Sequence, residues 1–228
     1  MKLLLTSGGV TNDSIRAALE GLLGKPIDEA DALFIPTAQW GHPMCSPASV
    51  YRSIVGRGED WLTNLGWRSL GVLELTALPS IGRERWEPWV RDADVLFVDG
   101  GEAVYLADWM RESGLADLLP ELDSVWVGVS AGSMALTPRI GEHFVERRPG
   151  EGDATLGVVD FSIFPHLEYP GWSENTRDVA AQWAHDLLSE PGMPSTAYAL
   201  DDASAIVVDG DRVEVVSEGE WAVFGPGV

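Results

Sequence analysis

The chain has 228 residues, of which 45% are hydrophobic, and its 36 acidic and 15 basic side chains give a formal net charge of −21. Phosphate backbones and anionic lipids are bound by Lys and Arg side chains, so this charge excludes nucleic acid and membranes as expected partners. No uncharged apolar run reaches about 18 residues and the N-terminal run is too short for a signal peptide, so we expect a soluble, cytoplasmic protein. The single cysteine, Cys45, excludes an intramolecular disulfide and a cysteine-based zinc site.

Strand-like and helix-like segments alternate along the first 130 residues. The continuous apolar run Lys2–Thr6 is typical of a strand that is covered on both faces. A helix capped by Thr11 or Asn12 follows, and Gly24 ends it. The later segments in this part are strands predicted over 32–36, 69–75, 95–98 and 125–129, and helices predicted over 49–65, 83–92 and 102–113.

The last third of the chain has shorter segments. We expect a strand over 161–165 and a helix over 174–188, and then short strands over 197–200, 205–208 and 212–216. The last two strands flank Asp209-Gly210-Asp211 and predict a small β-hairpin. The whole pattern predicts an α/β fold, a doubly wound and mostly parallel sheet in a single domain over residues 1–228, with its site at the carboxyl ends of the strands.

The most informative segment is Val125–Leu136, an apolar strand that runs through Gly128-Val129-Ser130-Ala131-Gly132 into a helix start. This Gly-x-Ser-x-Gly pattern is typical of a nucleophile elbow, in which glycines leave room for a tight turn that exposes the serine hydroxyl. The alternative is a chance match in a chain with 25 glycines. Ser130 is the predicted nucleophile, and Ser133 is expected only to cap the helix.

A serine nucleophile needs a base, and the chain has four histidines. His166 emerges where an apolar strand ends, which is where an open α/β sheet places its site, so it is the predicted base. A structural histidine is the alternative. His42, in a Gly-His-Pro loop, is the second choice or lines the substrate cleft, whereas His143 and His185 are expected at solvated positions.

The third member of a serine site is a carboxylate that orients the imidazole. Asp201 and Asp202 follow a predicted strand, and each could instead be an ordinary turn residue. The glycines at 100 and 101 end another strand and either donate a second N–H to an oxyanion or form a simple tight turn.

These segments resemble the dipeptidase E (aspartyl dipeptidase) family and, more distantly, the cyanophycinases. The resemblance extends in family order over nearly the whole chain, and Gly128–Ser133 is its most specific part. The matching segments are Leu3–Asn12, Phe34–Ala38, Asp99–Gly101, Gly128–Ser133, Phe164–His166 and Ala199–Asp202.

The resemblance implies a flavodoxin-like fold similar to class I glutamine amidotransferases and a cofactor-free serine peptidase that hydrolyses small peptides. We expect no metal, because the histidines and acidic residues show no HExxH-like or paired spacing, and we expect a monomer or homodimer. By position, Ser130 is the nucleophile, His166 the base and Asp202 the acid. Gly101 and Ala131 match the oxyanion-hole positions. Thr176-Arg177 resembles the element whose arginine holds an acidic substrate in relatives that cleave after an N-terminal Asp.

One departure from the family pattern concerns specificity. Where relatives have Gly-Gly-Asn-Thr, this chain has Gly100-Gly101-Glu102-Ala103. A carboxylate beside an acidic substrate repels it, so we expect an N-terminal residue other than Asp, with Glu102 binding the substrate's α-amine or a basic side chain.

Two other functions remain open at this point. One is an amidase, esterase or acyl transferase with the same triad, since an elbow does not choose the leaving group. The other is a non-catalytic binding protein that keeps the fold. A glutamine amidotransferase is disfavoured because that chemistry uses a cysteine where this chain has Ser130.

Overall fold

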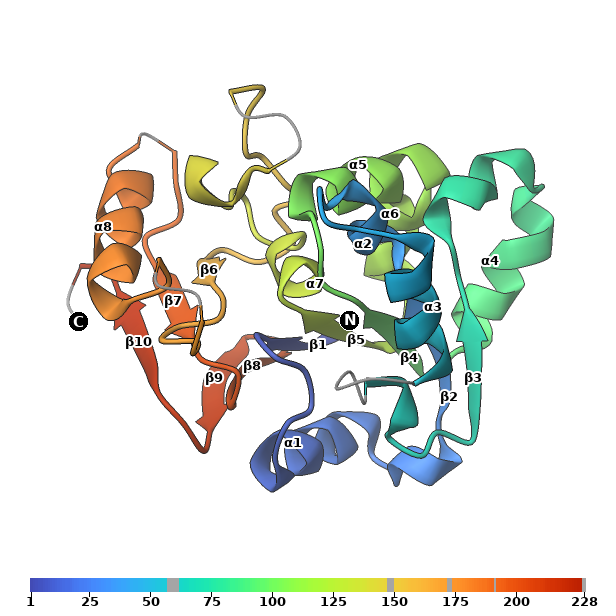
Figure 1. Cartoon of the computed structure of the whole chain (residues 1–228). Coiled ribbons are helices and arrows are strands. Elements are labelled where there is room, and N and C mark those ends of the chain that lie inside the picture. Colours follow the sequence, from blue (N-terminus) through green and yellow to red (C-terminus); the bar gives the residue numbers. More distant parts are fainter. Residues whose placement is uncertain (57–61, 147–149, 172–173, 191, 227–228) are drawn as a thin grey trace.

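The computed structural model describes the whole chain except residues 57–61, 147–149, 172–173, 191 and 227–228. Within the described residues the strands form a seven-stranded sheet and a three-stranded sheet, and helices pack on both faces of the larger one (Figure 1). The α/β class with a mostly parallel sheet, predicted from the sequence, is confirmed.

The larger sheet has five parallel strands and, at one edge, an antiparallel hairpin. Its strands lie in the order β3 (Ser69–Val72), β2 (Asp31–Ile35), β4 (Val95–Val98), β5 (Val125–Val129), β1 (Lys2–Thr6), β8 (Ser204–Asp209) and β9 (Arg212–Ser217). The hairpin predicted near the C-terminus is β8 and β9, and it extends this sheet by pairing antiparallel with β1. Thr6 at the end of β1 lies opposite Val129 of β5 and Ala205 of β8.

Alternate residues of the central strands enter two different cores. On one face, Leu4 and Phe34 pack against Leu19 of α1, and on the other face Leu5 packs in the same core as Leu106 of α5. All five are buried, which explains why these strands are continuously apolar. The α-helices are α1 (Asp13–Leu23), α2 (Thr37–Gly41), α3 (Pro47–Val55), α4 (Arg83–Asp92), α5 (Ala103–Ser113), α6 (Leu115–Leu118), α7 (Ala131–Met134) and α8 (Arg177–Leu188).

Five short 3₁₀ helices complete the connections among the described residues. They are η1 (Ile27–Glu29), η2 (Leu62–Asn64), η3 (Leu75–Ser80), η4 (Leu119–Glu121) and η5 (Glu142–Phe144). No helix in the described part of the chain has the length and apolar character that crossing a bilayer requires.

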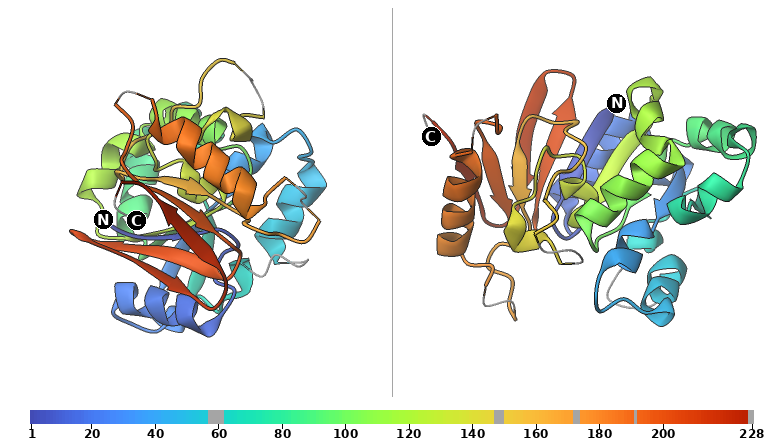
Figure 2. Two further views of the ribbon diagram at one scale, coloured as in Figure 1. Left: turned by 90° about the vertical axis from the view of Figure 1, so that its left-hand side faces the viewer. Right: turned by 90° about the horizontal axis from the view of Figure 1, so that it is seen from above.

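The smaller sheet holds the strand that leads to His166. Its order is β10 (Trp221–Phe224), β7 (Ala197–Leu200) and β6 (Ser162–Phe164), with β6 and β7 parallel. Helix α8 packs beside it through Trp183 and Leu187, at one end of the molecule (Figure 2). The sequence analysis expected a single open sheet, whereas β6 and β7 belong to this second one.

The helix predicted over 49–65 is wrong in its second half. Helix α3 begins earlier, at Pro47 after a capping box from Ser46, and ends at Gly56, whose φ of 63° is left-handed. The Asn64 side chain donates to the Gly56 carbonyl at 2.7 Å, which satisfies an oxygen that a continuing helix would have used. Residues 57–61 of the predicted helix lie outside the described residues.

Candidate active site

Ser130 lies on a tight turn between β5 and α7. Its backbone has φ 48° and ψ −110°, an uncommon conformation for a residue with a side chain. A Cβ on Gly128 would lie 2.6 Å from the Gly132 backbone, and one on Gly132 would lie 2.3 Å from the Val98 carbonyl oxygen. The strand, turn and helix predicted around Ser130 are therefore present, and the two glycines allow its backbone segments to approach.

The side chains of Ser130, His166 and Asp202 meet in one line of hydrogen bonds. The His166 Nε2 atom lies 3.0 Å from Ser130 Oγ, and its Nδ1 atom lies 2.7 Å from Asp202 Oδ1. Since a carboxylate only accepts, Nδ1 carries a proton and Nε2 accepts from the serine hydroxyl in the neutral ring. The sequence predicted these three side chains, and the structure brings them together.

The smaller sheet positions the base and the acid. Strands β6 and β7 are parallel neighbours, and His166 and Asp202 each follow the end of one of them. His166 has a φ of 56°, so the chain turns sharply just after β6 and aims the ring at Ser130. The expectation that the acid follows the next strand in the sheet is met, although in the smaller sheet.

Burial raises the pKa of the Asp202 carboxyl, but the other interactions outweigh it. The hydrogen bond and charge of His166, and the hydrogen bond from Ser7, bring this pKa below its ordinary value of 3.8. Asp202 is thus held as an anion, the form that stabilises a protonated imidazole.

The neighbouring Asp201 organises the turn. Its carboxylate accepts from the backbone N–H of Ala203 at 3.0 Å, from the Ser204 hydroxyl at 2.5 Å and from the Glu220 N–H at 2.6 Å. The two roles that the sequence left open for this pair are therefore divided between them: Asp202 contacts the histidine, and Asp201 holds the loop.

A second turn, at Gly100 and Gly101, faces Ser130. Gly101 has a φ of 137°, and a Cβ there would lie 2.3 Å from the Ala38 backbone, so only glycine fits. Asp99 Oδ1 accepts from the Gly100 N–H at 2.8 Å, and its other oxygen accepts from Gln39. Within the described residues, neither the Gly101 nor the Ala131 N–H donates to another protein atom, so both are available to an oxyanion.

A cleft of about 330 Å³ opens beside Ser130. Its lining includes His42, Gly100, Gly101, Phe144, Glu146, Pro165, His166, Tyr169 and Asp202. His42 Nε2 lies 3.0 Å from Glu146 Oε2, whereas the imidazole that contacts the Ser130 hydroxyl is that of His166, so His42 lines the cleft without making this contact. No Lys or Arg lines the cleft within the described residues, whereas Asp99 and Glu146 do.

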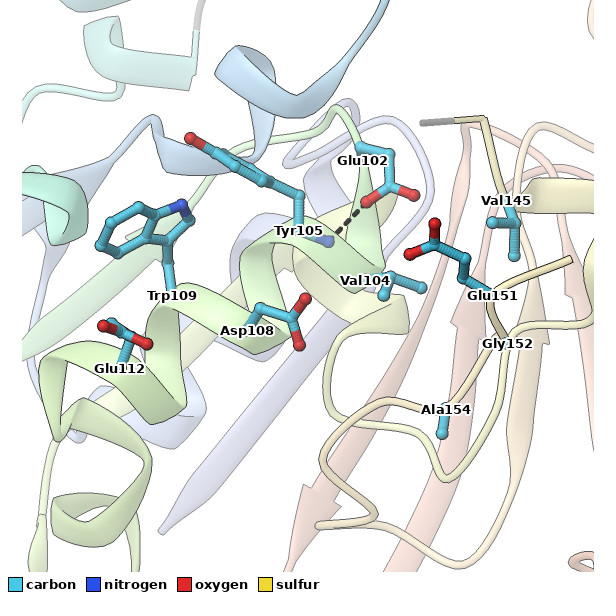
Figure 3. Close-up of a pocket in the computed structure, with 10 residues that line it drawn as sticks. All are labelled: Glu102, Val104, Tyr105, Asp108, Trp109, Glu112, Val145, Glu151, Gly152 and Ala154. Carbon is cyan, nitrogen blue, oxygen red and sulfur yellow. Dashed lines mark hydrogen bonds between the residues drawn. The ribbon is translucent and has the colours of Figure 1, made fainter. Parts of the chain in front are cut away.

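Glu102 lines a different cavity, of about 410 Å³, next to α5 (Figure 3). Its side chain caps α5 by accepting from the Tyr105 N–H, and the residue is only 2% exposed. The cavity is lined by further acidic side chains, Asp108, Glu112 and Glu151. The structure does not bring Glu102 into the Ser130 cleft, and its predicted contact with substrate stays a prediction that this burial disfavours.

Arg177, another predicted substrate contact, begins α8 and is not among the residues that line the cleft. Its guanidinium pairs with Glu220 at 3.0 Å, and its backbone N–H donates to Glu168.

Ser133 does not cap α7 as expected: its hydroxyl donates to the Thr6 carbonyl at 2.8 Å. His143 is exposed, as expected, and one face of its ring stacks against Phe164.

Sequence reasoning missed Ser7 as a site residue. Its hydroxyl donates to Asp202 Oδ1 at 2.9 Å and accepts from the His166 backbone N–H at 2.6 Å. The one feature of the sequence that could have identified Ser7 is its place directly after the first strand, at the edge where the site was expected.

Among the described residues, no three His, Cys, Asp or Glu side chains are grouped so that they could hold a metal ion.

Comparisons with known proteins find peptidases. The family model described as peptidase family S51 matches residues 3–216. An uncharacterized peptidase of Listeria monocytogenes is 26% identical over 191 residues, which is 79% of this chain and 82% of that protein.

Two crystal structures share the fold. One, titled as a candidate peptidase E from Listeria monocytogenes EGD-e, has a TM-score of 0.67 at 20% identity, covering 96% of this chain and 98% of that one. The other, a peptidase from an acI-B1 Actinobacterium, has a TM-score of 0.65 at 22% identity, covering 96% and 88% of the two chains.

Proposed function

The chain belongs to peptidase family S51 and is a peptidase, and we propose that it hydrolyses short peptides as a serine enzyme through Ser130, His166 and Asp202. The observation that carries the proposal is the pair of hydrogen bonds on the His166 ring, 3.0 Å to the Ser130 hydroxyl and 2.7 Å to the Asp202 carboxylate. A base within hydrogen-bond reach of a nucleophile, itself oriented by an acid, is the arrangement that serine acyl transfer needs.

The first half of the proposed reaction forms an acyl-enzyme. Ser130 Oγ attacks the scissile carbonyl carbon as its proton passes to His166 Nε2, and the carbonyl oxygen becomes an anion between the N–H groups of Gly101 and Ala131. When the carbonyl re-forms, the C–N bond breaks, and His166 returns the proton to the leaving amine.

The second half releases the acid product. Water replaces the amine in the cleft and loses a proton to His166 Nε2 as its oxygen attacks the acyl carbon. The Ser130–acyl bond then breaks, and the serine oxygen takes the proton back from His166. Asp202 remains ionised throughout and stabilises each imidazolium that forms.

The lining of the cleft favours a substrate whose N-terminal residue is not acidic. Within the described residues the lining has two carboxylates, Asp99 and Glu146, besides Asp202, and neither Lys nor Arg. A negative side chain placed there meets like charges, whereas the free α-amine of a peptide meets opposite ones. We expect neutral or basic N-terminal residues to be cleaved faster than Asp.

A fluorophosphonate probe tests the nucleophile. Intact-protein mass should show one adduct on the wild type and none on Ser130→Ala or His166→Ala, because only a serine activated by its base reacts. Ser162→Ala is the matched control, since it removes another buried hydroxyl, which donates to the Arg139 backbone carbonyl and does not contact the three residues. Equal labelling of Ser130→Ala and the wild type would contradict the proposal.

Substrate class is tested with Xaa-Leu dipeptides at equal concentration, followed by release of free leucine. Lys-Leu and Ala-Leu should be hydrolysed at higher kcat/KM than Asp-Leu. Asp-Leu as the best substrate would refute the specificity while leaving the serine mechanism intact. Labelling by the probe without hydrolysis of any dipeptide would instead favour an esterase or amidase.

A further inference from the structure

Two consecutive residues at the end of β1 contact all three members of the site. The Thr6 carbonyl accepts from the Ser130 N–H at 3.0 Å, and it also accepts from the Ser133 hydroxyl. The Ser7 hydroxyl contacts the backbone of His166 and the carboxylate of Asp202. The nucleophile is thus fixed to Thr6, while the base and the acid are fixed to the next residue.

This arrangement joins two sheets. Ser130 follows β5 of the larger sheet, whereas His166 and Asp202 follow strands of the smaller sheet. The distance between Nε2 and the serine hydroxyl therefore depends on how the two sheets sit against each other. Ser7 extends from β1 of the larger sheet and bonds both residues of the smaller one.

The hydroxyl of Ser7 acts both as a donor and as an acceptor, which the methyl side chain of alanine cannot do. It donates to Asp202 Oδ1, which also accepts from His166 Nδ1, and it accepts at 2.6 Å from the His166 N–H. Ser7 is fully buried, so water does not replace these bonds freely when the hydroxyl is removed. His166 has a positive φ, and the bond to its N–H helps to hold that uncommon backbone conformation.

We propose that Ser7 is a positioning residue, which sets the His166 imidazole against the Ser130 hydroxyl by holding both the backbone of the base and the carboxylate of the acid. The proposal rests on the proposed serine mechanism. Ser7 is buried, is not among the residues that line the cleft, and acts through His166. Removing the Ser7 hydroxyl should therefore slow the chemical step and leave the binding of substrate unchanged.

The experiment measures inactivation by the fluorophosphonate probe at a series of probe concentrations, which separates the maximal rate constant from the half-saturating concentration. Ser7→Ala should lower the maximal rate constant by at least about tenfold, which corresponds to about 1.4 kcal/mol of lost transition-state stabilisation. Its half-saturating concentration should stay within about twofold of wild type. Ser162→Ala, which also removes a fully buried hydroxyl, should change neither value by more than about twofold.

Ser7→Thr supplies the rescue, because it keeps the hydroxyl, and it should recover most of the lost rate. A Ser7→Ala rate within twofold of wild type overturns the proposal, and so does a folded Ser7→Thr that is as slow as Ser7→Ala. Where Ser7→Thr does not fold, the comparison of Ser7→Ala with Ser162→Ala decides. If the wild type does not react with the probe, the result counts against the serine mechanism itself. A Ser7→Ala rate close to that of a reactive wild type counts only against the positioning role of Ser7.

Discussion

At the scale of single residues, the site is defined by how each polar atom is used. The two ring nitrogens of His166 contact two different residues, Asp202 and Ser130. Asp202 accepts hydrogen bonds from His166 and Ser7, whereas the carboxylate of Asp201 accepts from the adjacent loop. Neighbouring residues of the same type therefore do different work because their contacts differ. Local sequence reasoning left Asp201 and Asp202 as alternatives, and only the family resemblance favoured Asp202 as the acid.

The pKa of Asp202 leads to a prediction about stability and pH. Because this pKa is lower in the folded protein than its ordinary 3.8, the ionised carboxylate stabilises the fold at higher pH. That contribution should be complete above about pH 5 and be lost as the pH falls through 3.8 toward the folded pKa. Urea unfolding of wild type and Asp202→Asn from about pH 6 to about pH 3 measures it.

The difference in unfolding free energy between the two proteins should shrink as the pH falls. Asp201→Asn offers a comparison at the adjacent residue, for which the structure gives a loop contact and no bond to His166. A difference that stays constant, or grows, on acidification would contradict the direction of the Asp202 shift.

How far the site was predictable also depends on the residue. Ser130 and His166 each follow a strand, and the elbow pattern and the strand end were enough to find them, whereas the choice of Asp202 over Asp201 came from the family resemblance. Ser7 also follows a strand, but a serine after a strand is common, and only the fold shows which side chains it meets. Glu102 and Arg177 were assigned by resemblance, and their local hydrogen bonds point elsewhere.

At the scale of secondary-structure elements, the strand, turn and helix at Ser130 leave no room for larger residues. Gly132 is the tightest point, since a Cβ there would overlap the Val98 carbonyl oxygen at 2.3 Å. Backbone atoms cannot move aside as a flexible side chain does, so a substitution must shift β4 or the elbow itself.

We therefore expect Gly132→Ala to lower the free energy of unfolding by about 3 kcal/mol, the upper part of the range for overpacking. Gly21→Ala is the matched control: Gly21 lies within α1 with nothing within 4 Å of the added carbon, so alanine should raise stability by about 0.5–1 kcal/mol. Denaturant unfolding of both variants measures the two effects. A Gly132→Ala protein as stable as wild type would contradict this description of the elbow.

The elements of the larger sheet were the most predictable. Leu3–Leu5, Val95–Val98 and Val125–Val129 are apolar throughout because both of their faces are buried, and a pattern set by burial is visible in sequence. The end of α3 was not predictable, because Gly56 is one of many glycines and the Asn64 contact that closes the helix is a tertiary one. The separate smaller sheet depends on the pairing of β10 with β7, which short segments do not specify.

At the scale of the whole molecule, the net charge of −21 acts on stability through self-repulsion. Salt screens charges over a Debye length that falls from about 30 Å at 0.01 M to about 10 Å at 0.1 M. Compaction brings like charges closer, so screening should favour the folded state.

The Tm at pH 7 should therefore rise by at least about 2 °C between about 10 mM and about 300 mM NaCl, as measured by differential scanning fluorimetry. The same series near pH 4.5 serves as the control, because partial protonation of carboxylates reduces the charge, and the rise should be smaller there. A Tm that is flat or falls with salt at pH 7 would show that local ion pairs, and not net repulsion, dominate.

The central place of β1 bears on when this protein becomes active during its synthesis. Thr6 and Ser7 are synthesised before the residues that they bind, and β8, which pairs with β1 from the other side, is synthesised after those residues. Until Asp202 and β8 have been translated, Ser7 has no carboxylate to bind and β1 has one open edge. On the proposed mechanism, a nascent chain that has not yet reached Asp202 and β8 is therefore inactive, and activity follows only after these segments have folded against β1.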